Sequence, residues 1–162
     1  MSLNLKKQLL SKMLENFEAE MNVMAKAAAE AREAATHEES IAEDKYDTRG
    51  LEASYLAGAQ AKRAAELQLI IHSLQSLELN TFDKDSPISM TALAEVSSNL
   101  KSSLYFIAPK GGGMNLNIDN KCIQVITPDS RLGKELMGKH AGDTFELKIA
   151  ERLNDYEILK VY

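Results

Sequence analysis

The sequence predicts an α+β protein in which a helical first half precedes a second half rich in strands. All three prolines (Pro87, Pro109 and Pro128) and six of the eight glycines follow residue 80. β-Branched residues number six in residues 1–80 and 14 in the remainder. Proline and glycine are unfavourable inside helices, whereas β-branched residues favour strands. The change in composition therefore places a boundary near residues 80–87, where Asn-Thr-Phe-Asp-Lys-Asp-Ser-Pro is typical of a turn-forming linker.

Two heptad stripes of apolar residues predict that the first half is an antiparallel coiled-coil hairpin. Between the stripes, residues 36–50 continue neither one and include Gly50, so the chain is expected to reverse there. The first stripe contains Leu10, Leu14, Phe17, Met21, Met24, Ala28, Ala31 and Ala35, and the second contains Ala53, Ala57, Gln60, Ala64, Leu67, Ile71 and Leu74.

Folding the chain back at this point pairs alanines near the turn and large apolar residues at the other end of the hairpin. Ala31 then faces Ala57, whereas Phe17 faces Ile71. An arm of this kind would be slim at its tip and roughly 50–60 Å long at 1.5 Å per residue. The alternative is a two-helix piece of a larger bundle, but alanines bury too little surface to organise a third helix.

Short strands and one short helix are expected in the second half, which predicts a small, curved antiparallel sheet. Asp129 or Ser130 would cap the helix, and Gly138 would end it. A hairpin through residues 152–155 would join the last two strands. The expected strands are residues 104–108, 123–126, 144–149 and 156–161. The domains are thus a hairpin over 1–80 with its tip near 38–52, a linker over 81–87 and a C-terminal domain over 88–162.

Composition excludes several classes of function. The net charge of −5 argues against a partner bound mainly through nucleic-acid phosphates. A lone cysteine, Cys122, rules out an intrachain disulfide and a multi-cysteine metal site, and its apolar strand predicts a core position. The histidines, His37, His72 and His140, are expected to be structural or surface residues. Without a membrane-spanning stretch or a secretory signal, a cytoplasmic location is expected.

Acidic residues crowd the reversal of the hairpin. Lys45 and Arg49 offset only part of this charge, and a solvated loop is the simplest interpretation. Carboxylates at the end of a long arm can also hold Mg²⁺ or orient a water molecule. A flexible tip does not preorganise a metal, so such a site would belong to a partner. The acids are Glu38, Glu39, Glu43, Asp44, Asp47 and Glu52.

Three stretches resemble the bacterial Gre transcript cleavage factors, the GreA/GreB-like transcription elongation factors. Residues 125–143 read Val-Ile-Thr-Pro-Asp-Ser-Arg-Leu-Gly-Lys-Glu-Leu-Met-Gly-Lys-His-Ala-Gly-Asp. They closely follow the C-terminal family pattern of Thr/Ser-Pro-x-Ser-x-Leu-Gly, then Leu-x-Gly-Lys and Gly-Asp. Residues 156–161 match the last strand of the family, and residues 51–57 look like its Asn-Ala-Glu-Tyr-x-Ala stretch.

The resemblance implies an N-terminal coiled coil and an FKBP-like C-terminal domain with one short helix. In the family, the C-terminal domain docks at the rim of the secondary channel of RNA polymerase, and the coiled coil enters that channel. Tip carboxylates then help the polymerase hold Mg²⁺ and a water molecule, and the polymerase hydrolyses backtracked RNA. The chain would accordingly be an accessory factor rather than an enzyme, binding no cofactor alone and sharing Mg²⁺ with the polymerase.

Bacterial RNA polymerase is the implied partner, with nascent RNA reached only through the polymerase, little DNA contact and no membrane. The docking segment of the family maps onto Asp129, Ser130, Leu132 and Gly133. Arg131 stands where the family usually has proline.

The tip departs from the family pattern, because the positions of the two family acids fall on Thr48 and Leu51. The nearby acids Asp44, Asp47 and Glu52 are therefore the candidates for assisting catalysis, without holding a stable metal in isolation.

Three alternatives stay open. The first is a non-cleaving Gre-fold regulator or inhibitor that occupies the same channel. The second is an FKBP-like peptidyl-prolyl isomerase or chaperone, although the chain has no tryptophan and few aromatic residues to line a proline pocket. The third is a coiled-coil adaptor without a catalytic link.

Overall fold

The computed structural model describes residues 2–37, 48–83, 85–99, 101–149 and 152–162. Two long helices come first, and six strands with one short helix follow. The chain divides into two compact units, one of residues Leu14–Gln75 and one that combines Met1–Met13 with Ser76–Tyr162. This element order confirms the α+β class, with a helical hairpin ahead of a sheet domain.

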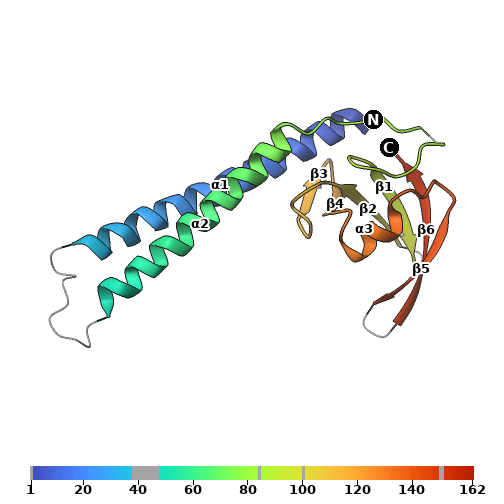
Figure 1. Cartoon of the computed structure of the whole chain (residues 1–162). Helices are drawn as coiled ribbons and strands as arrows, with labels where there is room; N and C mark the ends of the chain where they lie inside the picture. Colours follow the sequence, from blue (N-terminus) through green and yellow to red (C-terminus); the bar gives the residue numbers. More distant parts are fainter. Residues whose placement is uncertain (1, 38–47, 84, 100, 150–151) are drawn as a thin grey trace. The chain divides into compact units, whose positions relative to one another are not determined.

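The hairpin consists of α1 (Ser2–Thr36) and α2 (Arg49–Gln75), which run antiparallel and side by side (Figure 1). Every predicted stripe residue from Leu14 onward is buried or half-buried, including the polar Gln60. The heptad prediction is therefore confirmed. Gly50 lies within the first turn of α2, so the reversal of the chain precedes it.

Packing along the hairpin changes from large residues to alanines, as the sequence predicts. Phe17, Leu67 and Ile71 are buried at one end. Ala31 is buried, and Ala57 is half-buried, toward the other. Across the two helices, Arg63 Nη2 lies 2.7 Å from Glu20 Oε1. The 27 residues of α2 span about 40 Å and the 35 residues of α1 about 52 Å.

The second unit contains one six-stranded sheet in the order β3-β4-β2-β1-β6-β5. The sheet is mixed, because β2 and β4 pair in parallel while the other neighbours are antiparallel. The prediction of a wholly antiparallel sheet is thus wrong at this pair. The strands are β1 (Leu93–Ser98), β2 (Lys101–Ile107), β3 (Asn115–Ile118), β4 (Lys121–Ile126), β5 (Thr144–Ile149) and β6 (Arg152–Val161).

Two strand predictions need correction. Residues 152–155 are not a turn, since they begin β6 and pair with β5 from Ile149↔Arg152 to Glu146↔Asp155. Only two residues separate the end of β5 from the start of β6. In addition, β1 was not predicted, although it lies centrally between β2 and β6.

A buried cluster fills one side of the sheet. It brings together residues of β1, β5 and β6 with Leu136 of α3 (Arg131–Leu136). Leu132 of the same helix packs at the edge of the cluster. Gly138 follows α3 at φ +80°, a conformation that favours glycine, which agrees with its predicted role in ending the helix.

The first turns of α1 contribute buried residues, Leu5, Lys6, Leu9 and Met13. Lys6 is fully buried, and its Nζ donates a hydrogen bond to the carbonyl oxygen of Asn80 at 2.8 Å. The same ammonium lies 4.3 Å from the ring centroid of Phe82. Both partners lie in the chain segment after α2, so Lys6 links the two chain segments that make up this unit.

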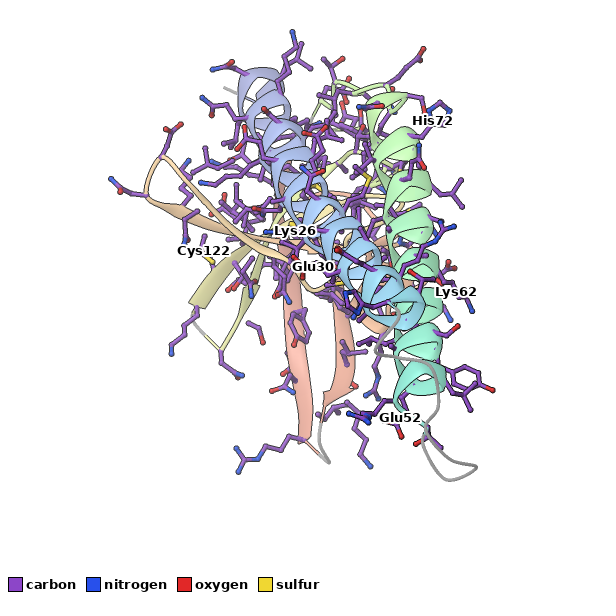
Figure 2. All side chains as sticks on the ribbon, turned by 90° about the vertical axis from the view of Figure 1, so that its left-hand side faces the viewer. Lys26, Glu30, Glu52, Lys62, His72 and Cys122 are labelled. Atoms are coloured by element: carbon purple, nitrogen blue, oxygen red, sulfur yellow. The ribbon has the colours of Figure 1, made fainter. Side chains whose placement is uncertain are left out.

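Cys122 is exposed in β4, so its predicted core position is wrong (Figure 2). Side chains alternate between the faces of a strand, and the neighbouring Ile123 and Val125 are the buried ones. His37, His72 and His140 are exposed, as expected for surface residues. No helix in the described part of the chain is both long and apolar enough to cross a membrane.

Candidate functional site

The segment before α3 forms a tight turn that Ser130 holds together. Ser130 is extended, with φ −65° and ψ 158°, and it caps the helix. Its hydroxyl accepts a hydrogen bond from the Gly133 backbone N–H at 3.0 Å and donates one to the Thr127 carbonyl at 2.7 Å. The prediction that Ser130 or Asp129 caps this helix is therefore confirmed for Ser130.

Gly133 is required by close packing against the same turn. A Cβ atom built at this position would lie 2.0 Å from the carbonyl oxygen of Thr127 and 2.8 Å from Ser130 Oγ. Backbone atoms cannot move aside as a flexible side chain does, so only glycine fits. Ser130 and Gly133 thus shape the predicted docking segment from within.

The other residues of the predicted docking segment differ in exposure. Leu132 is half-buried against the core cluster, whereas Asp129 and Arg131 are exposed on either side of Ser130. The segment therefore presents one acidic and one basic side chain at the surface, on a backbone that the turn holds rigidly. These exposed charges are the groups of the segment that a partner can contact.

A cavity of about 580 Å³ lies beside α3, lined by Ser130, Arg131 and Leu132. Tyr105 of β2 and Tyr156 of β6 form part of its wall. Burial, followed by the nearby Tyr156, raises the pKa of Tyr105, while a hydrogen bond with Ser103 opposes this shift. Sequence reasoning missed the two tyrosines because they come from strands far apart in the chain.

A second glycine turn borders this cavity. A Cβ atom at Gly112 would lie 3.2 Å from Thr127 Cγ2. The Gly113 N–H donates to the Val125 carbonyl at 2.9 Å, and Gly113 has φ +91°. Thr127 is consequently enclosed by the turn at Gly112 and by α3, so both loops contribute to the same surface.

At the hairpin tip, Glu52 is the candidate acid that the structure describes. It lies in the first turn of α2 and is exposed (Figure 2). The hydroxyl of Thr48 donates a hydrogen bond to Glu52 Oε1 at 2.8 Å. A carboxylate near a helix N-terminus also interacts favourably with the helix dipole. Glu52 therefore has a local structural role in starting α2.

The other two candidate acids, Asp44 and Asp47, lie outside the described residues. Within the described part of the chain, no group of three or more His, Cys, Asp or Glu side chains is placed to hold a metal ion. Glu52 alone supplies one hard oxygen donor group of the kind that Mg²⁺ prefers, so further ligands would have to come from elsewhere.

Exposed apolar side chains accompany Glu52 on α2. Leu51 is 57% exposed, and Tyr55 is 73% exposed. Both belong to the stretch that resembles the Gre tip, and neither packs in the hairpin seam. Large apolar groups that are left in water at the end of a narrow arm are available for contact with a partner.

Comparison with known proteins gives matches among solved structures only. No family model and no curated protein sequence matches the chain. The chain is similar to Gfh1, a GreA factor homologue of Thermus thermophilus, with 18% identity and a TM-score of 0.37 over 96% of this chain and 93% of that one. Gfh1 of Thermus aquaticus gives 20% identity and a TM-score of 0.39, with the same coverage of both chains.

A GreA/GreB elongation factor of Nitrosomonas europaea is 15% identical, with a TM-score of 0.37 over 59% of this chain and 78% of that one. Likenesses this distant do not assign an activity.

Proposed function

We propose that the chain is a Gre-like factor that binds bacterial RNA polymerase through the secondary channel and modulates elongation. The observation that carries this proposal is the narrow two-helix hairpin, whose seam changes from Phe17, Ile71 and Leu74 to alanines toward the tip. Such a hairpin is narrow toward its tip, which is the end that would enter a channel. Its exposed tip residues would then be delivered to a site in the partner.

Docking in this proposal uses the turn from Thr127 to Gly133. Because Ser130 and Gly133 fix the backbone, the exposed Asp129 and Arg131 are held in place before binding. Preorganised contacts of this kind reduce the entropy cost of association. Arg131 stands where the family usually has proline, so the chain would present a positive charge to the partner surface at this position.

Cleavage in this proposal depends on Asp44, Asp47 and Glu52 together with the polymerase. When bound at the polymerase site, Mg²⁺ would stabilise the negative charge that develops during hydrolysis of the RNA. The chain would contribute carboxylate oxygens that help hold the ion and orient a water molecule. The protein would thus act as an accessory factor, because the polymerase supplies most of the site.

A non-cleaving regulator of the same channel is the second candidate. Thr48 and Leu51 occupy the two positions where the Gre family has its acids, and Glu52 is engaged by the Thr48 hydroxyl. A hairpin without correctly placed acids would still occupy the channel and block access to it.

The tyrosine-lined cavity beside α3 favours a further candidate, an FKBP-like isomerase or chaperone. Tyr105, Tyr156 and Leu132 would contact a proline side chain there. An assay of tetrapeptide isomerisation tests this directly, and activity that disappears in Tyr156→Ala would support it.

The deciding experiment follows RNA length in purified, backtracked polymerase complexes incubated with Mg²⁺, with and without the protein. Asp44→Ala, Asp47→Ala and Glu52→Ala are compared with Glu18→Ala, an exposed acid on α1 well away from the tip sequence. Polymerase binding is measured for each variant. We expect shortened RNA with the wild type and with Glu18→Ala, and loss of shortening in at least one tip variant that still binds.

Other results distinguish the candidates. Binding without shortening identifies the non-cleaving regulator. An absence of polymerase binding by the wild type overturns the proposal as a whole. Asp129→Ala and Arg131→Ala test the docking surface separately, since both side chains are exposed and each change is expected to weaken binding without unfolding the protein.

A further inference from the structure

A second cavity, of about 450 Å³, lies in the sheet unit and shares Gln124 with the cavity beside α3. Leu5 of α1, Leu93 of β1 and Leu104 of β2 give it an aliphatic wall. Glu95, Lys121 and Tyr162 supply polar groups at the same cavity. An apolar wall with a few converging polar groups is the usual composition of a small-molecule site.

Glu95 is half-buried at this cavity, and its charge is not balanced by an ion pair. Its Oε2 accepts a hydrogen bond from the Tyr162 hydroxyl at 3.3 Å, and this donor is neutral. No lysine or arginine in the described parts of the chain forms a salt bridge with it. Lys160 is its cross-strand neighbour on β6 but is exposed to solvent. A partly buried carboxylate of this kind favours a cationic group in the cavity.

Lys121 supplies the opposite charge. It is half-buried at the start of β4 and also forms no salt bridge with a described acid. Glu95 pairs with Leu104 of β2, which pairs with Ile123 of β4. Lys121 lies two residues before Ile123, so its Cα atom is about 12 Å from that of Glu95 across the sheet. Residues two apart on a strand face the same way, so Lys121 and Glu95 lie on the same face of the sheet.

We propose that this cavity binds a small zwitterion, an α-amino acid or dipeptide that carries an aliphatic side chain. The ligand ammonium would meet Glu95, and the ligand carboxylate would meet Lys121. Its aliphatic side chain would lie against Leu5, Leu93 and Leu104. Because none of these residues belongs to the docking turn or to the tip acids, the proposal stands independently of polymerase binding.

The test is a titration of the full-length, ¹⁵N-labelled protein, followed by NMR through its amide resonances. The probes are L-leucine and glycyl-L-leucine. Two half-probes serve as comparisons: isoamylamine, which lacks the carboxylate, and 4-methylpentanoate, which lacks the ammonium. We expect saturable shifts around Glu95, Leu104 and Lys121 with a zwitterionic probe, and at least tenfold weaker binding of each half-probe.

Two variants separate the charges. Glu95→Gln keeps a hydrogen-bond acceptor for Tyr162 but removes the negative charge, and Lys121→Met keeps the aliphatic stem. Each is expected to weaken binding of the zwitterion about tenfold, which corresponds to about 1.4 kcal/mol. Glu135→Gln and Lys110→Met, which do not line the cavity, are matched controls that should leave the affinity unchanged.

The proposal is overturned if neither zwitterion gives saturable shifts at millimolar concentration. Equal binding of the half-probes, or unchanged binding in both Glu95→Gln and Lys121→Met, also overturns it. Amide spectra of the unliganded variants show whether each one is folded. Since each variant removes a different charge, loss of folding in one still leaves the other as a test.

Discussion

At the scale of single residues, Gly133 is a position where an added methyl group would clash with the backbone of Thr127. A Cβ atom there would lie 2.0 Å from the Thr127 carbonyl oxygen. Gly133→Ala is therefore expected to lower the free energy of unfolding of the sheet unit by about 2–3 kcal/mol, because the turn must shift. Urea unfolding followed by the signals of the sheet unit measures this change.

Gly58→Ala is the matched control, since a Cβ atom at that helical position would meet nothing within 4 Å. Alanine is a better helix former than glycine, so this variant should stabilise the hairpin by up to about 1 kcal/mol. An unfolding free energy for Gly133→Ala equal to that of the wild type would show that Thr127 does not constrain this glycine.

Ser130 has a structural role that can be separated from docking. Ser130→Ala removes the acceptor for the Gly133 N–H and should cost about 1 kcal/mol. Ser130→Asp restores an acceptor and should recover most of this stability, as thermal unfolding would show. If binding to the polymerase is restored together with stability, Ser130 acts through the turn. If it is not, the hydroxyl itself contacts the partner.

The buried Lys6 is expected to make the free energy of unfolding depend on pH in the alkaline range. Burial lowers its pKa from 10.5 to about 8 in the folded protein. Between about pH 8 and the ordinary lysine value, the unfolded chain keeps a proton that the folded chain has lost. Stability is therefore expected to rise with pH across this window. Below pH 8 both states are protonated, and the slope from Lys6 disappears.

The measurement is the free energy of unfolding at a series of pH values from 7 upward, for the wild type and for Lys6→Met. The difference between the two curves isolates Lys6 from other groups that titrate in the same range. A difference that stays constant with pH would contradict the lowered pKa.

Single residues also mark where sequence reasoning succeeded and where it failed. The cap at Ser130 could be predicted because its hydroxyl accepts from the backbone N–H only three residues later, which depends on local geometry alone. Cys122 was misplaced because the face of a strand residue depends on register, and a shift of one residue moves a side chain to the opposite face. The roles of Asp44 and Asp47 stay predictions, since both lie outside the described residues.

At the scale of elements, the hairpin depends on the large residues of its seam. Leu67 is fully buried, whereas Leu69 on the same helix is 72% exposed. Leu67→Ala is expected to cost about 2–5 kcal/mol by leaving a cavity, and Leu69→Ala should change stability by less than about 0.5 kcal/mol. Helical circular dichroism during urea unfolding compares the two. Equal losses would mean that the seam does not stabilise the hairpin.

The helices were predictable and the sheet less so for a physical reason. A heptad stripe repeats over many residues, so the seam from Leu14 to Ala35 stands out in the sequence alone. A strand such as β1 has six residues, and its place between β2 and β6 depends on pairing with distant parts of the chain. The parallel pairing of β2 with β4 likewise arises from tertiary register, which no local pattern contains.

At the scale of the whole molecule, the sheet unit is assembled from both sides of the hairpin sequence. Met1–Met13 groups with Ser76–Tyr162, and Lys6 contacts Asn80 and Phe82. Removing residues 1–13 is expected to destabilise the sheet unit severely, because the buried Leu5, Leu9 and Met13 each represent about 1.5–3 kcal/mol of burial. Removing residues 1–3 should have little effect.

Amide hydrogen exchange of the sheet strands in the two truncated proteins gives the comparison. Faster exchange throughout β1, β2 and β6 is expected after removal of residues 1–13. Protection equal to that of the full-length protein would show that the first turns of α1 are not needed by the sheet.

The position of β6 has a consequence for how the protein is made. The middle strand β1 pairs with β2, which follows it closely, and with β6, which is synthesised last among the strands. Both helices of the hairpin leave the ribosome earlier and can pair through contacts that are near in sequence. Until residues 152–161 emerge, β1 exposes an unpaired edge of the kind that recruits other chains. Nascent chains stalled before β6 should therefore depend on chaperones although their hairpin is already folded.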